Sequence, residues 1–300
     1  MHNRQDIRDQ DASVDIKSSW KILEEIEFIR LSKLSKTVGK PVDLLTCGQL
    51  RYYDRGWDRV NSKQEKPLTH TEKVFHTVTT TEDPNIRELA KGDTANVFGT
   101  DAILACIMTC GRSNYSWDVV VDKIGDKIFF DKRDNSDFDY LSVDETAFEK
   151  PDDEDGINNP GKLAFEATYI NRMFSQMVLS KSKNGVYKFK EGNPFVDEGE
   201  EVASVGYRYR KWDLGDGINL VCRTEHDAVY KDAEGRTGFM NVKTFNEWKQ
   251  TPTMNWRQKL DKQRGAILAY GNLPIFDFIP LLPSSSKSCS PFSFIASIGC

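Results

Sequence analysis

The sequence lacks the short motifs by which many enzymes and metal proteins are recognised. It contains no glycine-rich phosphate loop, no Gly-x-Ser-x-Gly turn and no His-Glu-x-x-His helix. It also lacks an apolar run of 18 residues, so we expect no transmembrane helix and no membrane partner. The first 17 residues are polar and of mixed charge, which predicts that no signal peptide is present.

An excess of basic residues is missing too. Lys and Arg number 41 against 46 Asp and Glu, which gives a net charge of −5. Domains that bind nucleic acids are usually basic, so any such site here must be a local basic patch. The six cysteines have no zinc-finger spacing, and this predicts reduced thiols in a cytoplasmic protein without a metal or cofactor.

The residues that are present predict an α+β fold, with a mostly antiparallel sheet and helices packed on it. The hydrophobic fraction of 38%, with 17 Phe, 10 Tyr and 6 Trp, is enough for a core. Apolar spacing predicts helices over 19–35, 84–91 and 255–269, and two more that begin at Asp101 and Pro160. Alternation predicts strands over 72–80, 202–212, 218–229 and 238–245 and a hairpin over 117–131, whereas 36–67 has the composition of loops.

Two short acidic and basic motifs fall on neighbouring predicted strands. Glu225 and Asp227 point to one face of their strand, and Asn241 and Lys243 do so on the next. Acid-x-acid beside acid-x-Lys is the arrangement of a metal-dependent nuclease, in which the acids hold a divalent cation. Asn241 stands where the third acid would be and brings no charge, so an ordinary solvated or ion-paired strand face is the slightly favoured alternative.

Cations and aromatic residues alternate on the strand that carries Arg208, Arg210 and Trp212. This pattern suits contacts to phosphates together with base stacking, and structural salt bridges around a buried aromatic residue explain it equally well.

On the helix that begins at Pro160, a second face bears Thr168, Asn171 and Arg172 within about one turn. Asp101 and Tyr115 bracket an earlier helix, and a carboxylate with a stacking ring can hold a cationic base. Plain surface residues are the default alternative.

The segment 144–160 is strongly acidic. Its acids include Glu149, Asp152, Asp153, Glu154 and Asp155. Because it directly precedes the helix with Thr168, we favour a mobile segment that competes with RNA for a neighbouring cationic groove. The alternative is a solvated loop that aids solubility.

Several of these segments, in order from about Ser19 to Ala269, resemble the D-subunit family of eukaryotic translation initiation factor 3. The resemblance is carried by Val78–Pro84, Tyr115–Asp118, Phe129–Asp139, Tyr207–Trp212, Glu225–Asp227, Asn241–Trp248 and Trp256–Asp261. It implies a non-catalytic domain that binds the capped 5′ end of mRNA, with the fold of the decapping and 5′-end exonuclease family. It also implies other initiation factor 3 subunits and the small ribosomal subunit as partners.

The resemblance further implies roles for individual residues. The cap-contacting positions of the family correspond to Asp101, Asn114 and Tyr115 and to Thr168, Asn171 and Arg172. Asn114 stands where an aliphatic residue is common, and Arg172 stands where a His is common. Arg208, Arg210 and Lys243 are the expected RNA contacts, Glu225, Asp227, Asn241 and Lys243 form a degenerate nuclease motif, and the acidic segment resembles an RNA gate.

We therefore expect three regions: a disordered segment over 1–18, an incomplete cap-binding domain over 19–269, and a tail over 270–300 without family resemblance. Pro274, Pro280, Pro283 and Pro291 interrupt the tail, so we expect it to stay out of the sheet. The competing interpretations are a metal-dependent decapping or 5′-end nuclease, for which Asn241 is the discriminating residue, and a scaffold fragment that does not bind RNA.

Overall fold

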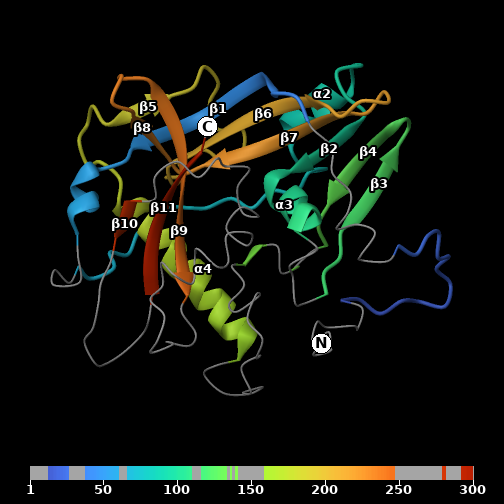
Figure 1. Cartoon of the computed structure of the whole chain (residues 1–300), viewed down its shortest axis with the longest axis horizontal. Coiled ribbons are helices and arrows are strands. Elements are labelled where there is room, and N and C mark those ends of the chain that lie inside the picture. The colour runs from blue at the N-terminus through green and yellow to red at the C-terminus, as the bar shows by residue number, and fades with distance from the viewer. Residues whose placement is uncertain are drawn as a thin grey trace, which may run out of the picture.

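The computed structural model describes residues 13–26, 38–60, 66–109, 116–133, 136, 139–140 and 159–246, and the strands at 279–281 and 292–299. Its centre is one sheet of 11 strands in the order β10-β11-β9-β8-β1-β6-β7-β2-β4-β3, with β5 paired to β1 (Figure 1). The strands are β1 (Val42–Tyr52), β2 (Val97–Thr100), β3 (Val120–Ile124), β4 (Lys127–Asp131), β5 (Val186–Lys188), β6 (Val205–Asp213), β7 (Asn219–His226), β8 (Ala228–Lys231), β9 (Thr237–Asn246), β10 (Ile279–Leu281) and β11 (Phe292–Gly299).

The sheet is mixed. β1 runs parallel to β8, and β2 runs parallel to both β4 and β7, while the other described pairings are antiparallel. The predicted α+β class and the dominance of antiparallel pairing are confirmed, and the parallel pairs are an addition. Parallel neighbours need a long connection between them, which is often a helix. Between the parallel strands β2 and β4 the chain passes through α3 and β3.

Short helices begin where local sequence supplies a cap. Asp83 accepts hydrogen bonds from the backbone N–H groups of Asn85 and Ile86 at the start of α2 (Pro84–Ala90). Asn159 does the same for Gly161 and Lys162 at α4 (Pro160–Met177), where proline suits the first turn. The remaining described helices are α3 (Asp101–Thr109) and the 3-10 helix η1 (Arg55–Arg59). Within the described residues no helix is both long and apolar enough to cross a bilayer.

Two apolar clusters anchor the helices to the sheet. The first joins α2 to the centre of the sheet and consists of Cys47, Ile86, Ala95, Phe98, Phe129, Tyr207, Tyr209 and Val221. The second joins the end of α4 to β8 and β9 and consists of Phe174, Val178, Leu179, Ala228, Met240 and Val242. In Figure 1 α4 accordingly runs beside β9, and α3 lies next to β2 and β7.

A buried ion pair fastens α2 to β7. Asp83 and Arg223 are 0% and 2% exposed, and Arg223 Nη1 lies 2.8 Å from Asp83 Oδ2. The Tyr209 hydroxyl donates to the same carboxylate at 3.0 Å, and Arg223 Nη2 donates to the carbonyl of Val78 at 2.6 Å. A charge this deep requires partners of this kind, because an unpaired one would cost several kcal/mol.

Three sequence predictions of local structure were wrong. Residues 19–26 of the helix predicted over 19–35 are not helical, and the rest of that range lies outside the described residues. The strand predicted over 72–80 is reduced to one bridge, Val74 with Val202, because no described strand lies alongside the rest. The loop predicted over 36–67 contains β1, the long inner strand that pairs with β5, β6 and β8.

The tail was also expected to stay out of the sheet, and this expectation was wrong. β11 pairs with β9 along Phe292–Gly299, and β10 pairs with β11 at the sheet edge. Pro274, Pro283 and Pro291 lie outside both strands, and Pro280 lies in the edge strand, where a missing N–H is tolerated. The helix predicted over 255–269 lies outside the described residues.

Candidate functional site

Asp101 connects the first residue of α3 to β7. α3 begins directly after β2, which ends beside Arg223 in the sheet, so the aspartate is placed against the end of β7. Its Oδ1 accepts a hydrogen bond from the N–H of Ala102 at 2.9 Å, and its Oδ2 accepts one from the N–H of Glu225 at 3.0 Å. The predicted helix residue and the predicted strand motif are therefore parts of one site.

The acids at this site influence one another, and one lysine opposes them. Burial, followed by the charge of Glu225, raises the pKa of Asp101 to about 6, while the N–H of Glu225 and the cations Arg223 and Lys243 act against this rise. Burial also raises the pKa of Asp227, and Lys243 again counteracts it. Glu225 and Lys243 thus lie near both aspartates, while Asp227 lies in the bend between β7 and β8 and not on the predicted continuous strand.

Hydrogen bonds within the fold occupy much of this acidic cluster. Glu225 Oε1 lies 3.0 Å from Arg223 Nη2, and Asp227 Oδ2 accepts the N–H of Val242 at 2.7 Å. No group of three or more His, Cys, Asp or Glu side chains among the described residues is arranged to hold a metal ion. The arrangement offers charges and hydrogen-bond acceptors for a bound group.

Asn241 is separated from the acids by its hydrogen-bond partner. Its Oδ1 lies 3.2 Å from His226 Nδ1, and the His226 ring stacks on Phe239 with centroids 5.4 Å apart. Burial, followed by the charge of Arg208, lowers the pKa of His226 to about 4, so the imidazole is neutral at pH 7. The neutral amide is therefore paired with a neutral ring.

The polar face predicted on α4 is buried instead of facing solvent. Thr168 and Asn171 are 8% and 9% exposed. Asn171 Oδ1 accepts the N–H of Thr244 at 2.7 Å, and the Thr168 hydroxyl donates to the carbonyl of Ala164. The bond between Thr244 and Asn171 holds α4 against β9, because a buried amide must find a partner. Arg172 is half-buried, with its guanidinium 5.5 Å from the centre of the Phe75 ring.

Arg208 and Arg210 share one carboxylate across the β1–β6 pair. Arg208 Nη2 lies 2.7 Å from Asp43 Oδ2, and Arg210 Nε lies 3.2 Å from Asp43 Oδ1. Arg208 also lies over the Phe239 ring and Arg210 over the Trp212 ring, at 4.9 and 5.3 Å. The salt bridges that were one of the two interpretations of this strand are therefore present. Because two arginines share the single carboxylate of Asp43, one positive charge is left in excess.

Sequence reasoning missed Arg223, His226, Phe239 and Asp43. Arg223 was missed because its buried partner Asp83 is distant in sequence and resembles an ordinary helix cap. His226 separates Glu225 and Asp227 in the predicted motif, and its position on the opposite face of the strand was the available signal. Asp43 gave no signal, because the composition around it predicted a loop.

The sequence matches known proteins over most of its length. A family model described as eukaryotic translation initiation factor 3 subunit 7 matches residues 1–271. The chain belongs to the D-subunit family of eukaryotic translation initiation factor 3. The resemblance inferred from the residues is thereby confirmed.

Curated members of the family extend well beyond the matched region. The D subunit of Aedes aegypti is 57% identical over 267 residues, which are 87% of this chain and 43% of that protein. The D subunit of Nasonia vitripennis is 55% identical over 273 residues, or 89% and 49% of the two chains. That of Homo sapiens is 52% identical over 267 residues, or 87% and 48%. The chain therefore spans about half the length of these relatives.

Some positions that the family resemblance assigned lie outside the described residues. These are Asn114 and Tyr115, which follow α3, and Glu149, Asp152, Asp153, Glu154 and Asp155 of the acidic segment. The described family positions are Asp101 at the start of α3 and Thr168, Asn171 and Arg172 on α4. Both helices contact the strands that bear the acidic and basic motifs, through Glu225 and Thr244.

Proposed function

We propose that this chain binds the capped 5′ end of mRNA, without cleaving it, as part of initiation factor 3 in translation initiation. The observation that carries the proposal is the hydrogen bond from the N–H of Glu225 to Asp101, which unites the family's cap-contacting helix with the nuclease-like strand motif. Capped mRNA, other subunits of initiation factor 3 and the small ribosomal subunit are the proposed partners, in the cytoplasm. The related fold is that of the decapping and 5′-end exonuclease family.

Asp101 is the residue best suited to recognise the positive charge of a methylated guanine. Its carboxylate is largely ionised at pH 7, because its pKa is about 6. It is also held in place by two N–H donors, so little side-chain freedom is lost when a ligand binds. A ring from Tyr115 would stack on the base, which is how proteins hold cationic aromatic groups.

The described α4 residues support the site more than they face a ligand. Asn171 uses its carbonyl oxygen to fix β9, and Thr168 bonds within its own helix. Arg172 is half-buried and keeps its charge near the same helix face. We propose that Arg172 contacts the phosphates of the cap, and that Thr168 and Asn171 position α4.

Binding without cleavage follows from the charges at the site. Hydrolysis of a phosphodiester by two metal ions needs several carboxylates that are free to coordinate. Asn241 supplies none, Glu225 is paired with Arg223, and Asp227 accepts the N–H of Val242. A nuclease is the second candidate, because Glu225 and Lys243 lie close enough to both Asp101 and Asp227 to shift the pKa values of these two aspartates.

Titration of the chain with 7-methyl-GTP and with GTP tests the proposal. We expect the methylated nucleotide to bind more tightly, and Asp101→Asn to reduce this difference several-fold while GTP binding changes little. Asp122→Asn on the exposed β3 is the matched control, since it removes the same charge far from the site. Equal affinities for the two nucleotides would refute a cap site.

A further inference from the structure

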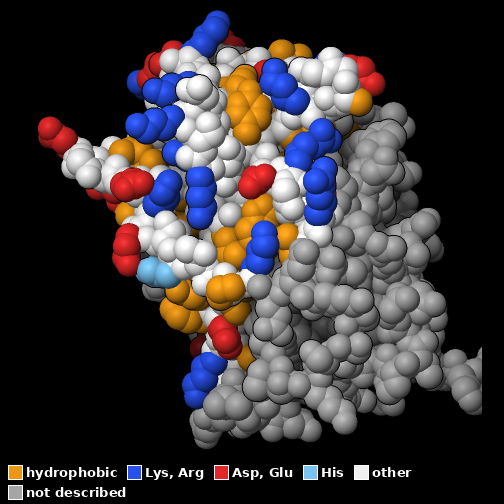
Figure 2. Space-filling model, turned by 90° about the vertical axis from the view of Figure 1, so that its left-hand side faces the viewer, with side chains coloured by type: hydrophobic (Ala, Val, Ile, Leu, Met, Phe, Trp, Pro, Cys, Tyr) orange, Lys and Arg blue, Asp and Glu red, His pale blue; other side chains and the backbone are white. Residues whose placement is uncertain are grey.

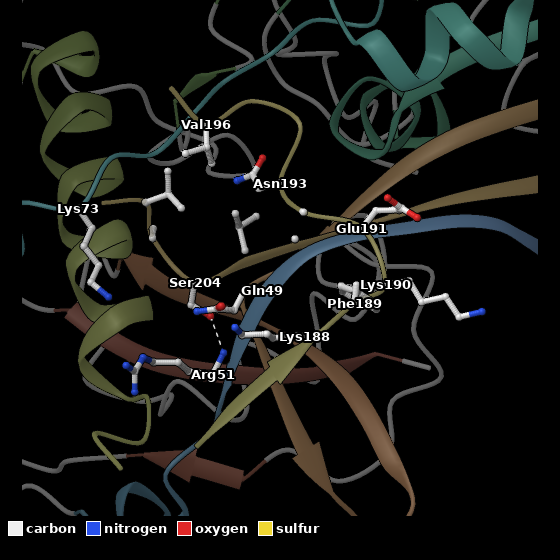
Figure 3. A pocket seen from close by; sticks show the side chains of 15 residues that line it. Gln49, Arg51, Lys73, Lys188, Phe189, Lys190, Glu191, Asn193, Val196 and Ser204 are labelled. Carbon is white, nitrogen blue, oxygen red and sulfur yellow. Dashed lines mark hydrogen bonds between the residues drawn. The ribbon is translucent and has the colours of Figure 1, made fainter. Parts of the chain in front are cut away.

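A cavity separate from the acidic cluster lies between β1, β5 and the segment before β6. Its volume is about 470 Å³, within the range of about 300–1,000 Å³ that is usual for small-ligand sites. Gln49 and Arg51 line it from β1, Lys188 from β5, and Ser204 from the segment just before β6, beside β1. Figure 3 shows that α4 passes along one side of it.

The cavity is cationic, although the chain as a whole is acidic. Four basic residues and a single carboxylate, that of Glu191, line it, whereas the net charge of the chain is −5. In Figure 3 Arg51, Lys73 and Lys188 lie on the side nearest α4, while the Glu191 carboxylate points to the other end. The face of the molecule seen in Figure 2 likewise carries many more Lys and Arg than Asp and Glu side chains.

The positive charges on the α4 side are only partly neutralised within the described part of the chain. Arg51 Nη1 donates to the carbonyls of Ser180 and Ser182 at 2.9 and 3.3 Å, which fixes the guanidinium without cancelling its charge. Lys73 is paired with Glu201 at 3.6 Å, and that glutamate side chain is 82% exposed. Among the described ion pairs none includes Arg51 or Lys188.

An amide in the cavity wall also lacks a partner among the described residues. Asn193 Oδ1 accepts the N–H of Phe195 at 3.0 Å, but its buried Nδ2 donates to no described atom. A buried donor without an acceptor is costly, and a ligand oxygen would relieve that cost. Three cations and a free N–H donor together suit an anion with several acceptor oxygens.

The cavity adjoins the proposed cap site through one serine. Ser204 Oγ donates to the carbonyl of Asp227 at 2.8 Å and accepts the N–H of Arg51 at 2.8 Å. Its N–H donates to Gln176 on α4 at 2.9 Å. A strand of RNA held near α4 is therefore within reach of the cavity.

We propose that this cavity binds phosphate groups, and that phosphodiesters of single-stranded RNA occupy it as a second contact beside the cap site. This inference rests on the proposed function, since it assumes that RNA bound at the cap site extends along α4. Arg51, Lys73 and Lys188 bind the phosphate oxygens, and Asn193 donates to one of them. A free phosphate ester has the same chemistry and is the other source of such a ligand.

Binding of an uncapped 12-residue oligouridylate with a 5′-hydroxyl tests the cavity, measured over a series of salt concentrations. Each phosphate contact contributes about 0.7 to the slope of log affinity against log salt for single strands. We expect Lys73→Ala and Lys188→Ala each to lower the slope by about 0.7, and Asn193→Asp to weaken binding several-fold. Asn193→Asp keeps the acceptor for Phe195. Lys123→Ala on the exposed β3 is the control with the same loss of charge.

Separate outcomes distinguish the cavity from the cap site and RNA from a free ester. If the lysine variants lower the slope while 7-methyl-GTP affinity is absent in every chain, the cap proposal fails and the cavity stands. Direct binding of inorganic phosphate at millimolar concentration, with no binding of the oligouridylate, would assign the cavity to a free ester and overturn the RNA contact. Slopes that match the unsubstituted chain, or a chain that binds neither probe, would overturn the cavity as a phosphate site.

Discussion

Replacement of Asp83 by Asn should destabilise the fold by an amount set by the buried ion pair. Asp83 is fully buried and accepts hydrogen bonds from Arg223, the Tyr209 hydroxyl and two N–H groups of α2. Asn has nearly the same shape and caps helices as well as Asp does, so the cap is retained. The substitution therefore removes the charge that neutralises Arg223 and replaces the oxygen that accepts from Arg223 Nη1 and the Tyr209 hydroxyl with an amide NH2 group.

The magnitude follows from what remains around Arg223. Loss of one partner of a buried pair costs about 3–5 kcal/mol. Glu225 still lies 3.0 Å from Arg223 Nη2, and its side chain is 39% exposed, so it compensates only in part. We expect the free energy of unfolding to fall by about 3 kcal/mol, near the lower end of that range. For a domain of this size, the melting temperature should fall by roughly 6–12 °C.

Urea unfolding followed by tryptophan fluorescence measures this change. Asp232→Asn is the control, because Asp232 forms an exposed pair with Arg236 and should leave the midpoint almost unchanged. Arg223→Met combined with Asp83→Asn should be less destabilising than the sum of the two single substitutions, by about 0.5–3 kcal/mol. A loss below about 1 kcal/mol for Asp83→Asn, or additive single effects, would refute the view that this pair fastens α2 to the sheet.

Three further predictions concern the site and its surroundings. Affinity for 7-methyl-GTP should fall as pH drops through about 6, because the raised pKa of Asp101 means that its carboxylate becomes protonated in that range. One pH unit lower, only about a tenth of this carboxylate stays ionised. A pH titration in which Asp101→Asn has the same profile as the unsubstituted chain would contradict this. Gly206→Ala should destabilise the chain by about 1–3 kcal/mol in thermal melts. The added Cβ would lie 2.6 Å from Phe189 Cε2 and 2.8 Å from Leu50 Cδ1. An unchanged melting temperature would show that these side chains move freely. Replacement of residues 149–157 by a Gly-Ser linker should tighten RNA binding at low salt, where like charges repel most, and unchanged affinity there would leave the acidic segment as a solvated loop.

Local signals in the sequence predicted the helices and the hairpin better than the sheet. α4 was predicted from Asn159, Pro160 and its apolar spacing, all of which act within the helix itself. β1 was missed because an inner strand is stabilised by its neighbours β5, β6 and β8, and its polar Asp43 and Arg51 hide any alternation. The opposite error over 72–80 arose because alternation alone cannot supply a partner strand.

The site shows the same division between local and distant signals. The period of a strand predicted Glu225 and Asp227 on one face, and both do lie near Lys243, although Asp227 falls in the bend between β7 and β8. The contact between Asp101 and Glu225 joins residues far apart in sequence and could not be derived from spacing. The burial of Thr168 and Asn171 was likewise set by the approach of β9 to α4, which the polarity of those residues does not reveal.

An RNA radiolabelled only within its cap tests most directly whether this chain retains a capped RNA end without cutting it. The RNA is incubated with the chain in Mg²⁺ or Mn²⁺, the complex is captured on a filter, and the label is then examined on a gel. We predict that the label is retained by the chain, is displaced by 7-methyl-GTP more readily than by GTP, and stays on full-length RNA. Release of labelled nucleotide that Asp227→Ala abolishes would contradict the account and establish a nuclease in its place.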